Sequence, residues 1–287
     1  MNKLVCPVAK MEKLLVATDG SIFSESAIRE AINLARTCSS KLIAISVVKT
    51  SPEFEDLVPQ VSEKAEKEMR EHLESVKSRA SKEGVDCEIV IHRGEEPFQN
   101  IVNDAAKNQV DMIIIGTHGR TGLKRLLMGS VTARVIGHAP CNVLVVPLHA
   151  KVECRHILVA TDGSRYSDAA ASEAIGIAKR CGGSLIVISV ALSDKEIILP
   201  EDDEEMILAK DNVKKIVGLA EKEGVKTEGL TAIGKPYEAI VETAKRKHAD
   251  LIVVGSHGRT GLDRLLMGSV TERVIGHSEV AVLVVKA

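Results

Sequence analysis

The chain of 287 residues repeats most of itself once. The run LLVATDGS at 14–21 returns as ILVATDGS at 157–164, 143 residues later. A longer run, GTHGRTGLKRLLMGSVTARVIGH at 116–138, returns as GSHGRTGLDRLLMGSVTERVIGH at 255–277 with only three positions changed. This period is far above the roughly 20–50 residues of solenoid or propeller repeats, so each copy is expected to fold as a complete domain. We place the two domains at 1–149 and 150–287.

Each copy alternates apolar runs with helix-like segments. The apolar runs, such as LIAISVV at 42–48, are nearly continuous, which is typical of strands covered on both faces. The order strand–helix–strand–helix with such strands predicts an α/β fold, with a doubly wound and mostly parallel sheet in each copy. In the first copy we expect strands at 13–18, 41–48, 86–92, 111–116 and 142–147, and helices at 21–38, 61–83, 97–108 and 129–138.

Composition excludes several functional classes. The formal net charge is -2, so no positive field of the whole chain draws it to nucleic acid or to an anionic membrane. Aromatic residues make up only 2%, too few for a platform that stacks bases. No apolar run approaches the roughly 20 residues of a membrane span, and residues 1–12 lack the apolar core of a signal peptide. These features predict a cytoplasmic protein with neither nucleic-acid nor membrane partners.

The six cysteines show no C-x-x-C spacing, which argues against a zinc knuckle and favours reduced thiols in a reducing cytosol. No H-E-x-x-H motif or Cys/His cluster predicts a transition-metal site. The histidines of the glycine-rich run, His118 and His257, could face a phosphate, although a contact with solvent or backbone is the simpler interpretation.

The chemistry-bearing motif is the glycine-rich run that follows the fourth strand. It reads Gly116-x2-Gly119-x9-Gly129-Ser130 and returns with the same spacing from Gly255. We interpret its first two glycines as positions where the backbone approaches a ligand closely. Its end starts a helix, whose free N–H groups would form an anion site together with the Ser and Thr hydroxyls. An acidic residue, Asp19 or Asp162, closes the first strand of each copy.

Neither the P-loop nor the Rossmann fingerprint matches this run, because the phosphate-bridging lysine and a G-x-G-x-x-G after the first strand are missing. Ligands of open α/β sheets bind outside the carboxyl ends of the strands, where the strand order reverses. Two copies of the run at such ends predict phosphate or nucleotide binding. The alternative is a set of turn glycines that only closes the fold.

With Ala-Thr-Asp after the first strand, the pattern G-x2-G-x9-G-(S/T) resembles the nucleotide-binding branch of the universal stress protein family, here as a tandem pair. The resemblance implies two doubly wound domains, each a five-stranded parallel sheet of order 3-2-1-4-5 with helices on both faces. It also implies ATP or AMP between the first and fourth strands. The implied ligand contacts are Ala17, Asp19, Val47, Gly116, Gly119, Arg120, Gly129, Ser130, Val131 and Thr132 in the first copy. In the second copy they are Ala160, Asp162, Val190, Gly255, Gly258, Arg259, Gly268, Ser269, Val270 and Thr271.

Within that set, Asp19 and Asp162 would contact the ribose, and the backbone of Val47 and Val190 would meet the adenine edge. Arg120 and Arg259 are the cationic candidates near the loop, with solvation at the surface as the alternative. Any Mg²⁺ would be held mainly by the nucleotide phosphates. Family members commonly dimerise through their last strands, so the two domains could form an internal pseudo-dimer, with a homodimer as a further possibility.

The sequence shows no committed nucleophile–base pair, which favours a nucleotide-binding regulatory protein of the stress response over an enzyme. Two alternatives stay open: a slow ATPase or phosphotransferase, and a partner-binding scaffold whose nucleotide is only structural. We also expect the two sites to differ. Lys124 is replaced by Asp263, and the acidic run 201–205 could fold over the second cleft and repel phosphates; the alternative is that the exchanged side chains both point to solvent.

Overall fold

The computed structural model describes residues 6–8, 11–51, 53, 57–119, 128–193, 200, 202–259 and 267–287. These residues gather into two compact units. The N-terminal unit holds the described residues between 11 and 149, and the C-terminal unit holds 6–8 together with the described residues from 150 onward. Each unit is described by itself below.

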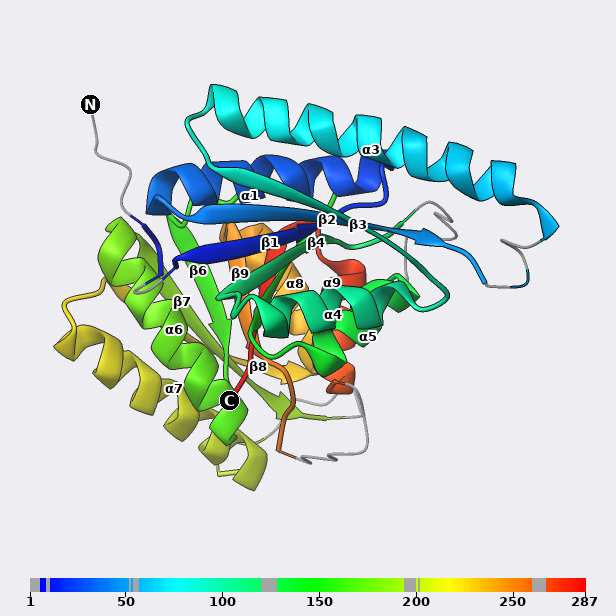
Figure 1. Ribbon diagram of the computed structural model, residues 1–287. Helices are drawn as coiled ribbons and strands as arrows, with labels where there is room; N and C mark the ends of the chain where they lie inside the picture. The colour runs from blue at the N-terminus through cyan, green and yellow to red at the C-terminus, as the bar shows by residue number, and fades with distance from the viewer. Residues whose placement is uncertain are drawn as a thin grey trace. The chain divides into compact units, whose positions relative to one another are not determined.

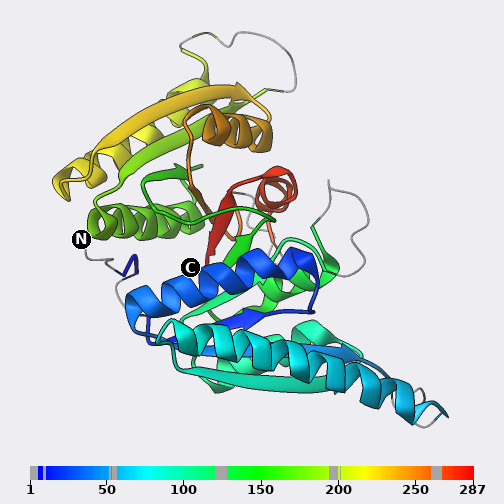
Figure 2. The ribbon, with the colours of Figure 1, turned by 90° about the horizontal axis from the view of Figure 1, so that it is seen from above.

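The N-terminal unit is built on parallel strands in the order β3-β2-β1-β4-β5. β1 lies between β2 and β4, with Leu14 opposite both Leu42 and Met112. Helices α1 and α3 cover one face of these strands and α4 and α5 the other (Figure 1). Seen from above, α1 and α3 run side by side (Figure 2). The strands are β1 (Lys13–Ala17), β2 (Lys41–Lys49), β3 (Cys87–Gly94), β4 (Met112–Gly116) and β5 (Asn142–Val146), and the helices are η1 (Ile22–Ser24), α1 (Glu25–Cys38), α3 (Pro59–Lys82), α4 (Pro97–Lys107) and α5 (Ser130–His138).

The C-terminal unit repeats this arrangement with the strand order β8-β7-β6-β9-β10, all parallel. Helices α6 and α7 pack on β6 and β7, and α8 packs beside α9. The strands are β6 (His156–Ala160), β7 (Ser184–Leu192), β8 (Thr227–Gly234), β9 (Leu251–Gly255) and β10 (Ala281–Val285), and the helices are α6 (Arg165–Cys181), α7 (Glu204–Lys222), α8 (Pro236–Arg246) and α9 (Ser269–His277).

The sequence explains why these elements form where they do. In β1, β4 and β9 nearly every residue is buried, as continuous apolar runs require when helices cover both faces. Pro59, Pro97 and Pro236 each start a helix, where a missing N–H costs nothing. Gly84, at φ 75°, follows the end of α3 in the left-handed conformation that glycine adopts most readily.

The α/β class, the parallel strands and the order 3-2-1-4-5 within each copy are confirmed, whereas the expected split of the ten strands into two separate sheets is not. One reason is visible inside each unit: β5 and β10 have one neighbour there, β4 and β9 respectively, so each leaves a strand edge at which a sheet can be extended. The helix expected over 21–38 is a 3₁₀ turn followed by α1.

The cysteines correct a second expectation. Cys87, Cys141, Cys154 and Cys181 carry reduced thiols, but Cys6 and Cys38 are disulfide-bonded. Spacing along the chain does not report which cysteines find a disulfide partner in the folded protein.

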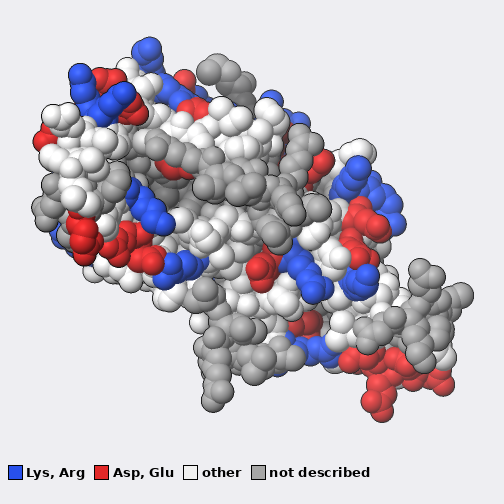
Figure 3. All heavy atoms as spheres, turned by 90° about the vertical axis from the view of Figure 1, so that its right-hand side faces the viewer, with Lys and Arg blue, Asp and Glu red and all other residues white. Residues whose placement is uncertain are grey.

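Charged side chains of both signs are mixed over the surface that Figure 3 shows. Across most of the face drawn in Figure 3, basic and acidic groups lie next to one another rather than in a field of one sign. Within the described ranges, no helix combines the length and the apolar character that a membrane span requires.

Candidate functional site

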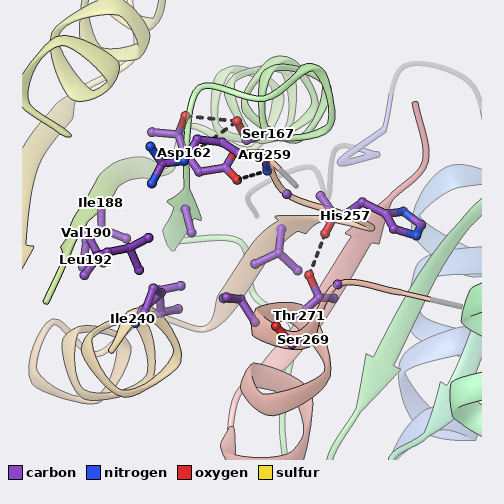
Figure 4. Close-up of a pocket in the computed structure, with 18 residues that line it drawn as sticks. Asp162, Ser167, Ile188, Val190, Leu192, Ile240, His257, Arg259, Ser269 and Thr271 are labelled. Carbon is purple, nitrogen blue, oxygen red and sulfur yellow. Dashed lines mark hydrogen bonds between the residues drawn. The ribbon is translucent and has the colours of Figure 1, made fainter. Parts of the chain in front are cut away.

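A cavity of about 310 Å³ opens at the carboxyl ends of β6 and β9, beside the end of β7 (Figure 4). β6 pairs with β7 on one side and β9 on the other, so this is the point where the strand order reverses. Every residue that the sequence predicted for the second site lines the cavity. The lining also includes His257, which the sequence offered as a residue that could face a phosphate, and residues that the sequence did not single out: Thr161, Ser167, Ile188, Leu192, Pro236, Ile240 and Val254.

Asp162 ties the end of the first strand to the glycine loop. Its Oδ1 accepts the Ser164 N–H at 3.0 Å, and its Oδ2 accepts the Arg259 N–H at 2.8 Å. Burial alone would raise the pKa of this carboxyl, but these hydrogen bonds outweigh burial and lower the pKa below its ordinary value. Asp162 is therefore an ionised clamp that fixes where the loop begins, in addition to any contact it makes with a ligand.

Gly255 and Gly258 lie where neighbouring protein atoms leave no room for a side chain. A Cβ added to Gly255 would lie 2.7 Å from the Tyr166 carbonyl carbon, and one added to Gly258 would lie 2.7 Å from the Asp162 Oδ2. These glycines allow α6 and the Asp162 carboxylate to approach the loop; because both also line the cavity, their close approach to a ligand stays a prediction. The same crowding holds at their counterparts Gly116 and Gly119.

The N-terminus of α9 forms one end of the cavity. Gly268 precedes the helix, and its carbonyl accepts the first helical hydrogen bond from the Glu272 N–H at 3.0 Å. The N–H groups of Ser269, Val270 and Thr271 have no partner earlier in the helix, so they are available to an anion. The Thr271 hydroxyl is not available in this way, because it is buried and donates to the Gly255 carbonyl at 2.8 Å. That corrects the expected role of the threonine hydroxyl.

The opposite side of the cavity is apolar. Ile188, Val190 and Leu192 project from β7 and face Ile240 of α8 (Figure 4). Alternation along a strand places residues two apart on the same face, so the position of Val190 could have predicted Ile188 and Leu192. The contribution of α8 could not be found this way, because its contact depends on how that helix packs on β7.

The polar rim holds Arg259 and His257. The Arg259 guanidinium forms an ion pair with Glu205 of α7, with 3.0 Å between Nη2 and Oε2. The His257 ring lies 5.1 Å from the Tyr166 ring, and its Nδ1 is 3.2 Å from the Ser256 hydroxyl. His257 is thus in contact with the protein, as well as lining the cavity.

The N-terminal unit brings the corresponding residues together. The Ser21 N–H donates to Asp19 Oδ1 at 3.0 Å, and the Thr132 hydroxyl donates to the Gly116 carbonyl at 2.9 Å. The remaining residues predicted for this site occupy equivalent places: Ala17 ends β1, Val47 lies in β2, Gly119 adjoins Asp19, and Gly129, Ser130 and Val131 begin α5. Arg120, Lys124 and Asp263 lie outside the described residues, so the expectations that rest on them stay predictions.

No group of three or more His, Cys, Asp and Glu side chains that could hold a metal ion occurs in the described part of the chain. The lining offers the backbone donors at the start of α9, one carboxylate and one guanidinium around an apolar wall. Such a site can bind a flat, partly apolar molecule that carries an anionic group.

The doubly wound parallel α/β unit occurs twice, and in the C-terminal unit a cavity opens at the switch point. The model of the universal stress protein family matches residues 10–147 and again 153–286. The chain therefore belongs to the universal stress protein family.

Individual relatives agree with that assignment. A universal stress protein of Mycolicibacterium smegmatis is 30% identical over 297 residues, which cover 95% of this chain and 96% of that protein. Universal stress protein MJ0531 of Methanocaldococcus jannaschii is 41% identical over 140 residues, or 47% of this chain and 81% of that protein. The crystal structure of a universal stress protein from Archaeoglobus fulgidus shares the fold, with a TM-score of 0.73 and 23% identity over 96% of this chain and 98% of that one.

Proposed function

We propose that the chain is an adenine-nucleotide-binding regulatory protein of the stress response, with one nucleotide site in each unit. The observation that carries this proposal is the C-terminal cavity, in which an apolar wall and a helix N-terminus face each other across the Asp162 clamp. Its volume of about 310 Å³ lies at the lower end of the range of ligand pockets, about 300–1,000 Å³.

Each part of an adenine nucleotide has a matching surface. The adenine ring packs against Ile188 and Val190, next to the open backbone at the end of β7. Its phosphate accepts hydrogen bonds from the first N–H groups of α9. The ribose reaches Asp162, whose two oxygens accept the N–H groups of Ser164 and Arg259 and, being carboxylate oxygens, can also accept a hydrogen bond from a ligand hydroxyl. The same assignment holds in the N-terminal unit for Val47, Asp19 and the first turn of α5. A bound Mg²⁺ would be carried by the phosphates.

Calorimetric titration with adenosine, AMP and ATP tests the proposal. Gly268→Phe places a large side chain at the start of α9, where the backbone φ of −68° permits it, and should abolish binding in the C-terminal site. Gly129→Phe should do the same in the N-terminal site. Gly218→Phe is the control, because nothing lies within 4 Å of a Cβ added there. Binding that is unchanged in the double variant Gly129→Phe/Gly268→Phe would refute the site assignment.

Two other functions are separated by further measurements on the same protein. A slow ATPase or phosphotransferase would release phosphate faster than a heat-inactivated control. A scaffold with a structural nucleotide would lose thermal stability on removal of the nucleotide without any change in partner binding.

We further propose that the last strand of each unit, Asn142–Val146 and Ala281–Val285, is the association surface of an internal pseudo-dimer and of a possible homodimer in the cytoplasm. Support comes from the apolar composition of both strands and from their having one strand neighbour inside their own unit. Sedimentation of the full chain over a range of concentrations tests the homodimer.

A further inference from the structure

Arg259 is the one lysine or arginine among the described residues that line the C-terminal cavity. Its backbone N–H is fixed on Asp162, so its side chain starts from the rim of the site. A ligand with several phosphates needs positive charge beyond what the first turn of a helix supplies. The availability of the Arg259 guanidinium therefore sets how much phosphate charge this site accommodates.

The Glu205 carboxylate forms an ion pair with that guanidinium. Nη1 donates to Oε1 at 3.3 Å and Nη2 donates to Oε2 at 3.0 Å, so that both carboxylate oxygens face the guanidinium fork. The side chains are 35% and 36% exposed, which leaves the pair reachable from solvent and from the cavity. The hydrogen bond from Arg259 lowers the pKa of Glu205, so the carboxylate is ionised at neutral pH.

The position of Glu205 is built into the start of α7. The Asp203 side chain caps this helix by accepting the Glu205 N–H at 2.9 Å. Glu205 lies in the first helical turn, where a negative charge is favoured by the helix dipole. Its carboxylate also accepts a hydrogen bond from the backbone of Leu192, which itself lines the cavity. The carboxylate is therefore held at the mouth of the site and not on a freely moving side chain.

The N-terminal unit lacks this carboxylate. Glu83-Gly84-Val85 corresponds to Glu223-Gly224-Val225, and the same offset places Ala65 of α3 where α7 has Glu205. The next residue, Glu66, is hydrogen-bonded to Arg70 at 2.9 Å and to Arg93 at 2.7 Å. The two glycine-rich runs thus have nearly the same sequence, but α3 and α7 carry different residues at corresponding positions.

We propose that Glu205 is a specificity-determining residue that neutralises Arg259, so that the C-terminal site prefers adenine ligands of low phosphate charge, AMP or adenosine, over ATP. The inference rests on the proposed nucleotide function of that site. AMP places its single phosphate on the α9 N-terminus and leaves the ion pair intact. The outer phosphates of ATP must displace Glu205 from Arg259, and they then lie near an unpaired carboxylate whose repulsion is felt within about 8–10 Å at ordinary salt.

The experiment uses the full chain carrying Gly129→Phe, which leaves the C-terminal site as the one to be titrated with adenosine, AMP and ATP. Glu205→Gln should raise the affinity for ATP about fivefold and that for AMP less than about twofold, and leave adenosine unchanged. Glu204→Gln is the matched control, because it removes the same charge from an exposed neighbour in the same helical turn. It should change no affinity by more than about twofold.

A double-mutant cycle makes the result independent of small changes in stability. If Glu205 acts mainly through Arg259, Glu205→Gln should raise ATP affinity clearly more while Arg259 is present than in an Arg259→Gln background, where only the direct repulsion between the carboxylate and the phosphates is removed. Equal ATP gains in both backgrounds, equal effects of Glu204→Gln and Glu205→Gln, or an equal shift for adenosine, AMP and ATP would each overturn the proposal. If the Gly129→Phe chain binds none of the three ligands, the nucleotide function of this site fails, and the inference fails with it.

Discussion

The two glycine runs are nearly identical in sequence, yet the helices that face them are not. In the C-terminal unit, α7 brings Glu205 to Arg259 and places Asn212 at the turn after β6, with the Asn212 Oδ1 2.6 Å from where a Gly163 Cβ would be. In the N-terminal unit, α3 has Ala65 at the first of these positions, and His72 lies 3.1 Å from the Thr18 hydroxyl at the second.

This comparison shows which part of the fold can vary. The glycine run is fixed by its own packing, since its glycines touch α6 and Asp162, and its threonine closes the helix onto the strand. The packing of the loop does not depend in the same way on the helix after the second strand, α3 or α7. Residues in the first turn of that helix can therefore change the charge at the mouth of the cavity without disturbing the loop. The motif supplies the site, and the variable helix supplies its selectivity.

The largest expected effect is on stability, and it comes from removing the Asp162 carboxylate. Asp162→Ala leaves the N–H groups of Ser164 and Arg259 without their acceptor, and we expect a loss of about 2–3 kcal/mol in the stability of the C-terminal unit. Hydrogen exchange measured by mass spectrometry reports each unit separately. Asp168→Ala is the control, because it breaks only an exposed pair with Lys215 and should cost less than about 1 kcal/mol. Faster exchange spread equally over both units would contradict a local clamp.

Acid should weaken the same clamp by a smaller amount. The pKa of Asp162 is lowered in the folded protein, so its contribution to stability is present above the ordinary carboxyl pKa and is lost as the pH falls through the lowered value. Denaturant unfolding of the parent and of Asp162→Asn should therefore differ by a constant amount from neutral pH to about 5, and the two should converge below about 4. A gap that persists at the lowest pH would assign the effect to packing instead of charge.

The residues that follow α1 and α6 differ between the two units, and we expect a smaller effect on stability from this difference. α1 is followed by Ser39 at φ 57°, whereas α6 is followed by Gly182 at φ 67°. A left-handed residue with a side chain is strained, so Ser39→Gly should stabilise the N-terminal unit by about 1 kcal/mol, and Gly182→Ser should destabilise the C-terminal unit by about the same. Thermal melting, with hydrogen exchange to assign the unit, measures both. Changes of the same sign in the two variants would be inconsistent with this cause.

The smallest expected effect comes from giving the N-terminal site the carboxylate that α7 provides in the C-terminal unit. In a chain carrying Gly268→Phe, Ala65→Glu introduces a carboxylate where α7 has Glu205, and ATP affinity at the N-terminal site should fall about threefold while adenosine affinity stays the same. Lys64→Glu makes a larger change of charge one residue earlier, at the position that corresponds to Glu204. If it lowered ATP affinity more than Ala65→Glu does, long-range charge would explain the difference better than a local contact.

The sequence predicted the fold of each copy and the lining of the second site because both depend on short-range patterns. Continuous apolar runs predicted the parallel strands, and the family resemblance carried by a motif at a strand end implied residues that the structure places around the cavity. The crowding of Gly258 by the Asp162 carboxylate could not be predicted, because the sequence does not reveal what lies next to a glycine in space. The pairing of Glu205 with Arg259 could not be specified from sequence, because it depends on where α7 begins after a variable loop. The disulfide-bonded state of Cys6 and Cys38 likewise depends on proximity in space.

The adjacency of β1 and β4 has a consequence for how each unit folds. Leu14 lies opposite Met112, so the central strand pairing joins parts of the chain almost a hundred residues apart. Contacts between such distant segments form slowly, because a long loop must close before they are gained. On the ribosome, Asp19 cannot meet Gly119 until most of the unit has emerged. A ligand that spans both strand ends would therefore bind only the completed unit, and would select finished molecules over partly synthesised ones.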